Sequence, residues 1–140
     1  MSVLSAAGLE DARRLPLARR AALAAEILVA YGRARVELRR GDLLETVEAL
    51  RRTSTTAPPD VAPRRLAQAA ARTLRFLPFD TRCLMSALVV TRLLARRGVP
   101  SVFVLGVSPG PGFAAHAWVE CDGRPILAAG DSSFGRLLEL

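Results

Sequence analysis

The chain has 140 residues, of which 51% are hydrophobic, and it carries a formal net charge of +7. This length predicts one domain over residues 1–140, and so many apolar residues exclude wholesale disorder. All of the basic residues are arginine, and aromatic residues make up only 5%. A nucleic-acid surface usually combines clustered cations with stacking aromatics, so the composition argues against nucleic acid and leaves an acidic partner open.

Cysteine content and hydropathy indicate the compartment. Two cysteines cannot staple a small secreted domain, so a reactive thiol is expected rather than a disulfide framework. Residues 1–9 are uncharged and lack the basic start of a signal peptide, and the most apolar stretch, 21–31, is too short to span a bilayer. We therefore expect a cytoplasmic protein without a membrane segment.

The first half of the chain, residues 1–75, is predicted to be helical. Apolar residues recur at helical spacing in three segments, 10–31, 42–52 and 64–74. Gly32 is expected to end the first helix, although a longer helix up to Gly41 is the alternative. Asp42 is positioned to cap the second helix.

Segment 80–98 predicts the central helix. It is apolar nearly all round, with Asp80 or Thr81 as its N-cap and Gly98 as its end. A helix that lacks a polar face is buried, so this one should lie in the middle of the fold. Cys83 falls in its first turn.

After residue 100 the pattern changes to strands. Strands are predicted over 101–107, 113–121 and 124–128, with a short last one within 131–140. Asp122-Gly123 is a hairpin turn signal. Helices first and an antiparallel meander in 101–140 predict an α+β fold, in which a helical N-terminal half packs on a small antiparallel sheet.

Cys83 and His116 carry the candidate chemistry. In the first turn of a helix, unpaired backbone amides and the helix dipole favour a thiolate. His116, the only histidine, lies in the middle of the second predicted strand. A cysteine at a helix N-terminus that faces a histidine on a strand is typical of thiol nucleophiles. The imidazole takes the thiol proton and later protonates the leaving group.

Less specific roles are open to the same residues. A cysteine in an apolar helix is often only a small core residue, and a histidine in a strand is often structural. Cys121 alternates off the His116 face beside a turn, so we expect it to pack. One histidine and two distant cysteines form no paired ligand motif, and no glycine-rich phosphate loop is present, so neither a metal nor a cofactor is expected.

The order and spacing of motifs in residues 81–130 resemble one family. The motifs are Thr81-Arg82-Cys83-Leu84, Leu93-Leu94-Ala95-Arg96-Arg97-Gly98-Val99-Pro100, Leu105-Gly106-Val107, and Phe113-Ala114-Ala115-His116-Ala117-Trp118-Val119-Glu120 before Asp122-Gly123. This set is similar to the lasso-peptide leader peptidases, the protease half of the lasso-peptide B protein. These are transglutaminase-like cysteine proteases. The resemblance implies a papain-like or transglutaminase-like domain with its catalytic cysteine at the N-terminus of the central helix.

The resemblance also implies a reaction and partners. Cys83 would attack the carbonyl at the leader–core junction of a ribosomally made precursor peptide, with His116 as base and then acid. The freed core would pass to a separate ATP-dependent lasso cyclase. The family holds the leader with a small winged-helix recognition domain, which we do not see in this sequence, so a separate leader-recognition protein is expected.

In this family an acid on the following strand orients the imidazole. We expect Asp131 in this role. With a two-residue turn at Asp122-Gly123, His116 lies opposite Ala129, and Asp131 falls on the same face one step along. A bulged turn would shift this register, and Asp122 or no acid at all are the alternatives.

Trp118 and Glu120 share the strand face of His116, and both are candidates for contact with the substrate peptide. Core packing is the alternative for Trp118, and a structural role is the alternative for Glu120. The backbone N–H of Cys83 would bind the oxyanion, with a second donor that the sequence does not identify. Two other functions fit the same fold: a non-catalytic scaffold that binds leader and cyclase, and a transglutaminase-type acyl transferase.

Overall fold

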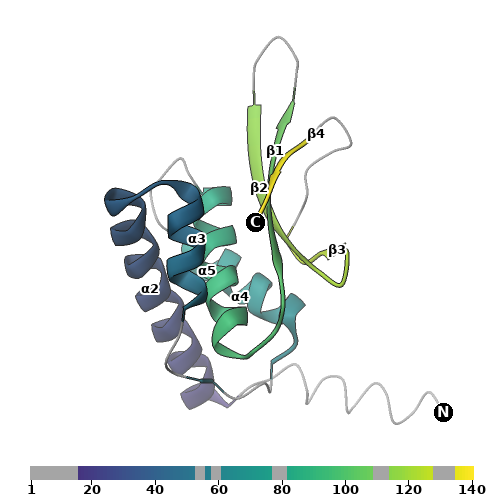
Figure 1. Cartoon of the computed structure of the whole chain (residues 1–140). Helices are drawn as coiled ribbons and strands as arrows, with labels where there is room; N and C mark the ends of the chain where they lie inside the picture. The colour runs from purple at the N-terminus through teal and green to yellow at the C-terminus, as the bar shows by residue number, and fades with distance from the viewer. Residues whose placement is uncertain (1–15, 53–55, 58–60, 77–81, 109–113, 128–134) are drawn as a thin grey trace, which may run out of the picture.

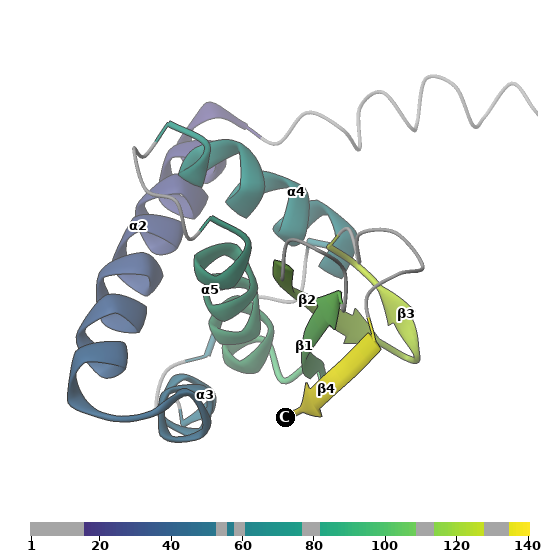
Figure 2. The same ribbon diagram turned by 90° about the horizontal axis from the view of Figure 1, so that it is seen from above.

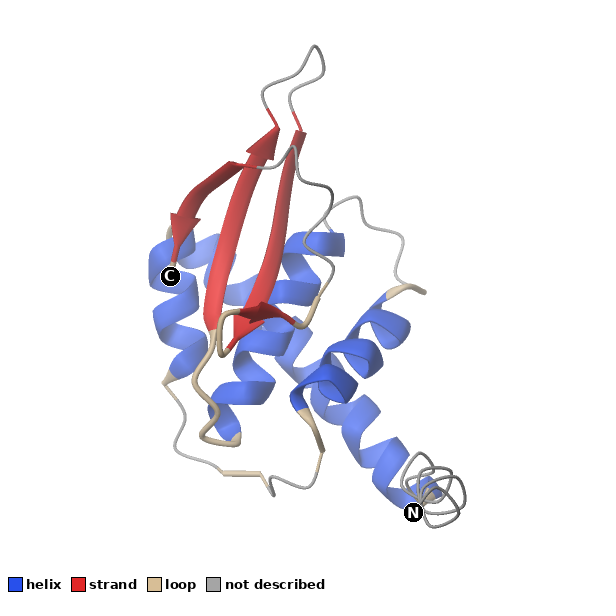
Figure 3. Ribbon diagram, turned by 90° about the vertical axis from the view of Figure 1, so that its right-hand side faces the viewer, coloured by secondary structure: helices blue, strands red, loops and turns tan. Residues whose placement is uncertain are grey.

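The computed structural model describes residues 16–52, 56–57, 61–76, 82–108, 114–127 and 135–140. Its elements are α2 (Leu17–Arg40), α3 (Leu43–Arg51), α4 (Pro63–Leu74), α5 (Arg82–Arg96), β1 (Val102–Ser108), β2 (Ala114–Cys121), β3 (Arg124–Pro125) and β4 (Gly135–Glu139). The helices lie on one side of the sheet (Figure 1, Figure 3), which confirms the predicted α+β fold. None of the described helices has the length and apolarity needed to cross a membrane.

Helix α2 is longer than the first of the two predicted alternatives. It continues through Gly32 to Arg40, and Gly41 follows in an extended conformation. A glycine inside a helix costs about 1 kcal/mol relative to alanine. Complete burial of Ala34 and partial burial of Leu38 beyond the glycine offset this cost. The predicted stop at Gly32 is therefore wrong, and the helix ends at the alternative, Gly41.

Local capping explains where the next two helices begin. The Asp42 carboxylate accepts a hydrogen bond from the backbone N–H of Glu45 at 2.9 Å, which confirms the predicted N-cap. Pro63 occupies the first turn of α4, where its missing N–H leaves no helical hydrogen bond unmade. The start of α4 is thus fixed by its own sequence.

The central helix is α5. Helices α2, α3 and α4 pack around it, and strand β2 packs against another of its faces (Figure 2). The apolar residues of α5 without exposed surface are Ala87, Leu88, Val89, Val90, Leu93 and Leu94. The helix ends in a Schellman motif, because Gly98 has a φ of 68° and the Val99 N–H donates to the Leu94 carbonyl at 3.0 Å. The predicted burial of this helix and its stop at Gly98 are both confirmed.

The strands form one antiparallel sheet in the order β3-β2-β1-β4. On β2, Ala117 and Val119 are buried in the core that the sheet shares with the helices. His116, Trp118 and Glu120 alternate with them and therefore lie on the opposite face. The sheet thus presents one face to the helices and carries the histidine on the other.

Strand β3 is shorter than the predicted 124–128. It pairs with β2 only at Arg124 and Pro125, and proline limits a strand because it has no N–H to donate. The turn before β3 has the two-residue form. Asp122 and Gly123 have φ values of 52° and 74°, and Cys121 pairs with Arg124 across them. The hairpin is therefore not bulged at its turn.

Candidate active site

Cys83 is the second residue of α5, and its side chain is half-buried. The predicted caps, Asp80 and Thr81, lie outside the described residues. Amide groups in the first turn of a helix have no acceptor inside the helix, and the helix dipole adds partial positive charge there. Cys83 therefore lies where the backbone stabilises an anion.

His116 reaches the same place from the sheet. On one side of β2, His116 pairs with Gly106 of β1. On the other side, among the described residues, β3 pairs with β2 only at Glu120 and Cys121 and not at His116. Cys83 and His116 both line one cavity of about 290 Å³. The two residues that the sequence singled out are thus brought to one site, although they come from a helix and a strand.

The rest of this cavity wall is mostly apolar. It is formed by Ala71, Leu74, Arg75, Ser86, Ala117 and Leu127. Arg75 carries the one charged group among these described lining residues, and its guanidinium lies 5.5 Å from the centroid of the Phe76 ring. An apolar wall with a cation at its edge suits an uncharged or acidic peptide better than a basic one.

Apart from Cys83 and His116, none of the lining residues was predicted as part of the site. Ser86 follows Cys83 by three positions, so helical spacing alone places both on neighbouring parts of one face. Arg75 and Leu127 reach the cavity from the end of α4 and from the segment after β3. Their place depends on how those elements pack, and no local pattern in the sequence signals it.

Trp118 supports the imidazole on the outer face of the sheet. The rings of His116 and Trp118 stack with centroids 5.9 Å apart and an angle of 25° between their planes. Gly106 gives the indole its room, because a Cβ atom there would lie 2.7 Å from the Trp118 ring. The indole is 3% exposed. His116 therefore rests against a side chain that has little freedom to move.

Glu120 in turn fixes Trp118. Its carboxylate accepts the indole N–H at 2.9 Å and two hydrogen bonds from the Arg136 guanidinium at 2.8 and 2.9 Å. The hydrogen bonds from Arg136 hold the pKa of Glu120 below its usual value, although burial acts in the opposite direction. Glu139 also pairs with Arg136. The ion pair of Glu120 and Arg136 thus fixes the position of the acceptor for the Trp118 indole N–H.

The remaining residues that the sequence singled out lie outside the Cys83 cavity or outside the described residues. Trp118 and Glu120 do not line the Cys83 cavity, and their contact with a substrate peptide stays a prediction. Asp131 lies outside the described residues. Cys121 packs against the core as expected, and burial raises the pKa of its thiol, with a further contribution from the charge of Asp122.

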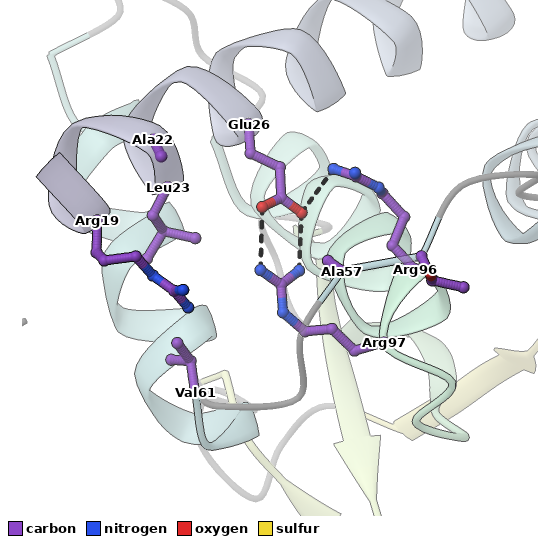
Figure 4. Close-up of a pocket in the computed structure, with 9 residues that line it drawn as sticks. Arg19, Ala22, Leu23, Glu26, Ala57, Val61, Arg96 and Arg97 are labelled. Carbon is purple, nitrogen blue, oxygen red and sulfur yellow. Dashed lines mark hydrogen bonds and ion pairs between the residues drawn. The ribbon is translucent and has the colours of Figure 1, made fainter.

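A second cavity, of about 240 Å³, lies at the other end of α5. Figure 4 shows Glu26 of α2 in its wall, held by Arg97 through hydrogen bonds of 2.7 and 3.0 Å and by Arg96 at 2.9 Å. Burial raises the pKa of Glu26, but the hydrogen bonds and charges of the two arginines outweigh it and lower the pKa overall. This cluster joins α2 to α5. Among the described residues, no three His, Cys, Asp or Glu side chains gather to hold a metal ion.

Comparison with protein-family models gave a match to the transglutaminase-like superfamily over residues 27–139. The matched span runs from α2 into β4 and contains both Cys83 and His116. Comparison with curated proteins gave no match, and comparison with solved structures gave none either.

Proposed function

Because the chain belongs to the transglutaminase-like superfamily, we propose that it is a cysteine endopeptidase that removes the leader peptide from a ribosomally made lasso-peptide precursor. Membership indicates activity of the cysteine-protease or acyltransferase type, in which a thiol forms a covalent intermediate with a carbonyl group. The narrower assignment is supported by the motifs around Cys83 and His116, which resemble those of lasso-peptide leader peptidases.

One observation carries the proposal: Cys83, in the first turn of α5, and His116, on β2, line the same cavity. Position 83 lies at a helix N-terminus, where unpaired backbone amides attract an anion, and we assign to His116 the role of taking the thiol proton. The rest of the cavity wall is mostly apolar, with Arg75 and Ser86 as its polar residues, and apolar surroundings strengthen these electrostatic effects.

The reaction proceeds in two halves. The Cys83 sulfur attacks the carbonyl carbon at the leader–core junction, and His116 takes the thiol proton. The Cys83 backbone N–H donates to the oxyanion. When the C–N bond breaks, His116 gives the proton to the core amine, and the leader is left as a thioester on Cys83. Water, losing a proton to His116, then releases the leader with a free carboxylate and restores the thiol.

His116 needs a fixed orientation for both proton transfers. The stack on Trp118, which Glu120 and Arg136 hold in place, restrains the plane of the imidazole. We assign the further orienting role to Asp131. The turn at Asp122-Gly123 has the two-residue form that this assignment assumes, but among the described residues β3 pairs with β2 only at Arg124 and Pro125, so the role of Asp131 stays a prediction.

The proposal includes partners. A separate winged-helix protein presents the leader, and an ATP-dependent cyclase takes the freed core, all in the cytoplasm. We propose that the recognition protein accelerates cleavage, because it holds the leader beside the protease.

The test is cleavage of the precursor peptide encoded beside this chain's gene, with the recognition protein added, followed by mass spectrometry. Wild type should yield a leader with a free carboxylate, and Cys83→Ala and His116→Ala should yield none. Cys121→Ala is the matched control and should cleave normally, because Cys121 packs against the core away from the cavity.

Three outcomes would overturn the proposal. Normal processing by Cys83→Ala would exclude the thiol mechanism. An amide adduct between the leader and an added amine, in place of the free carboxylate, would indicate the acyl transferase. Unprocessed precursor with wild type, together with stable binding of leader and cyclase, would indicate the scaffold.

A further inference from the structure

Helix α4 exposes a row of arginines. Arg64 and Arg72 lie on the exposed side of the helix, and Arg75 follows as its exposed C-cap residue. The opposite side buries Leu66, Ala67, Ala70 and Leu74 in the core. The sequence of α4 contains no acidic residue, so the helix supplies no counter-ion of its own.

The row has no anionic partner within the described chain. Some arginines of the chain pair with carboxylates, as Arg97 does with Glu26 and Arg136 with Glu120. Arg64, Arg72 and Arg75 make no ion pair with any residue that the structure describes. A cationic row without intramolecular anions can attract an external anion from a distance.

Helix stability does not explain the row. Cations near the C-terminus of a helix interact favourably with the helix dipole, which accounts for Arg72. Arg64, however, lies in the first turn, where the dipole disfavours a cation. An arginine at that position opposes the stability of its own helix, which points to a role outside it.

The row leads to the Cys83 cavity. Arg75 and Ala71 of the same helix line that cavity together with Cys83 and His116. Eleven positions separate Arg64 from Arg75, which corresponds to about 16 Å along the helix axis at a rise of ~1.5 Å per residue. An extended peptide covers this distance with about five residues.

We propose that Arg64, Arg72 and Arg75 bind an acidic segment of the substrate peptide that flanks the scissile bond. This inference rests on the proposed function for the Cys83 cavity and names the chemistry of its substrate. Guanidinium groups bind carboxylates through paired, charge-assisted hydrogen bonds, so Asp or Glu side chains on the peptide would meet the row. The row would hold the segment while the bond to be cut enters the cavity.

Binding can be measured without catalysis. The protein is the full chain with Cys83→Ala, and the probe is a short fluorescein-labelled Glu-rich peptide, with its Gln-rich equivalent as reference. Anisotropy should show binding of the Glu-rich probe that weakens steeply with added salt, and the Gln-rich probe should bind at least tenfold more weakly.

A matched pair of variants assigns the site. Arg64→Glu with Arg72→Glu should weaken binding of the Glu-rich probe at least tenfold and flatten the salt dependence. Arg39→Glu with Arg40→Glu makes the same change in net charge on the exposed end of α2 and should leave the affinity within about twofold. A Lys-rich probe should bind the α4 variant, Arg64→Glu with Arg72→Glu, better than it binds the Cys83→Ala protein without these two changes. Circular dichroism confirms that each variant is folded.

Three results would overturn the inference. Equal losses in the two double variants would show a general charge effect, and no loss in either would exclude α4. Tighter binding of single-stranded DNA than of the Glu-rich probe, abolished in the α4 variant, would make nucleic acid the partner. If the α4 surface binds the acidic probe but the wild type cuts no precursor, the protease proposal fails while the acidic-ligand surface stands. If instead the wild type cuts the precursor but the α4 surface does not bind the acidic probe, only the acidic-ligand surface is rejected.

Discussion

The indole N–H of Trp118 donates to the carboxylate of Glu120 at 2.9 Å, although the two residues are only two positions apart on one strand face. The other side of that indole is stacked against the ring of the candidate base, His116. Arg136, from β4 on the far side of β1, donates to the same carboxylate. A surface ion pair is thereby connected to the orientation of the imidazole through one buried aromatic ring.

We expect Trp118 to act as a positioning residue. Trp118→Phe keeps an aromatic ring beside His116 but loses the N–H, whereas Trp118→Leu loses the stack as well. With the precursor as substrate, kcat should therefore fall in the order wild type, Phe, Leu, while KM changes little, because Trp118 does not line the cavity. A rise in KM with an unchanged kcat would instead support the predicted contact of Trp118 with the peptide.

Glu120→Gln should weaken the interaction with Arg136 that holds the hydrogen-bond acceptor of the Trp118 indole in place. The neutral amide still accepts one hydrogen bond but loses the charge that opposes Arg136, so the free energy of unfolding should fall by about 1–3 kcal/mol. Arg136→Met tests the same pair from its exposed side and should cost less, because the Arg136 side chain is 43% exposed. Urea titration of both variants gives the comparison, and equal stability of all three proteins would show that the pair contributes nothing.

Gly106→Ala should displace the Trp118 ring. The added Cβ would lie 2.7 Å from the indole and 3.2 Å from the backbone oxygen of Gly135, and backbone cannot move aside cheaply. Overpacking of this kind destabilises by about 1–3 kcal/mol. Gly32→Ala is the control, because nothing lies within 4 Å of its new methyl group. In the interior of α2 it should stabilise by up to about 1 kcal/mol. Thermal unfolding that ranks the two variants the other way would contradict the packing of Trp118 over Gly106.

The Glu26 cluster predicts a loss of stability in acid. The arginines lower the pKa of Glu26 in the folded protein below its ordinary value of 4.5. The unfolded chain therefore takes up the proton first, so this contribution is fully present above about pH 4.5 and disappears as the pH falls through the lowered folded value. Glu120 behaves in the same way and adds to the slope.

Glu26→Gln isolates that contribution. At neutral pH the variant should be less stable than wild type by about 1–3 kcal/mol, because Arg97, only 5% exposed, loses its counter-ion. The difference should shrink as the pH is lowered, when wild-type Glu26 becomes neutral too. Glu120 is present in both proteins, so its titration cancels. Urea unfolding from pH 7 to pH 3 measures this, and a difference that is constant with pH would exclude the ionised carboxylate as its source.

Much of the fold followed from local sequence signals. The apolar surface of α5, the Asp42 cap and the Gly98 stop are each encoded within a few residues, and all were predicted correctly. The end of α2 was not, because the burial of Ala34 and Leu38 that carries the helix past Gly32 depends on distant elements. The length of β3 was also wrong, although Pro125 was visible in the sequence as a weak strand residue.

The site was predictable only in its local parts. Strand alternation places Trp118 and Glu120 beside His116, but nothing local indicates Arg136 as their partner. A bulge between Leu105 and Gly106 sets Arg136 opposite Gly106, in the row that His116 occupies. A shift of one residue would have set Leu137 there, and the sequence carries no signal for that register.

The two thiols of the chain should differ in reactivity at neutral pH. Cys121 is half-buried, and burial and the nearby charge of Asp122 raise the pKa of its thiol, so little thiolate forms there. Cys83 lies in the first turn of α5, in the cavity that it shares with His116, which we propose takes its proton. Iodoacetamide should therefore modify Cys83 first, as read from the two cysteine peptides by mass spectrometry. His116→Ala should slow modification of Cys83 and leave Cys121 unchanged as an internal control, because the imidazole is then no longer present to take the thiol proton. Faster modification of Cys121 would contradict the assignment of the nucleophile. If His116→Ala instead leaves the rate at Cys83 unchanged, the imidazole does not act on that sulfur, and the helix N-terminus alone accounts for its reactivity.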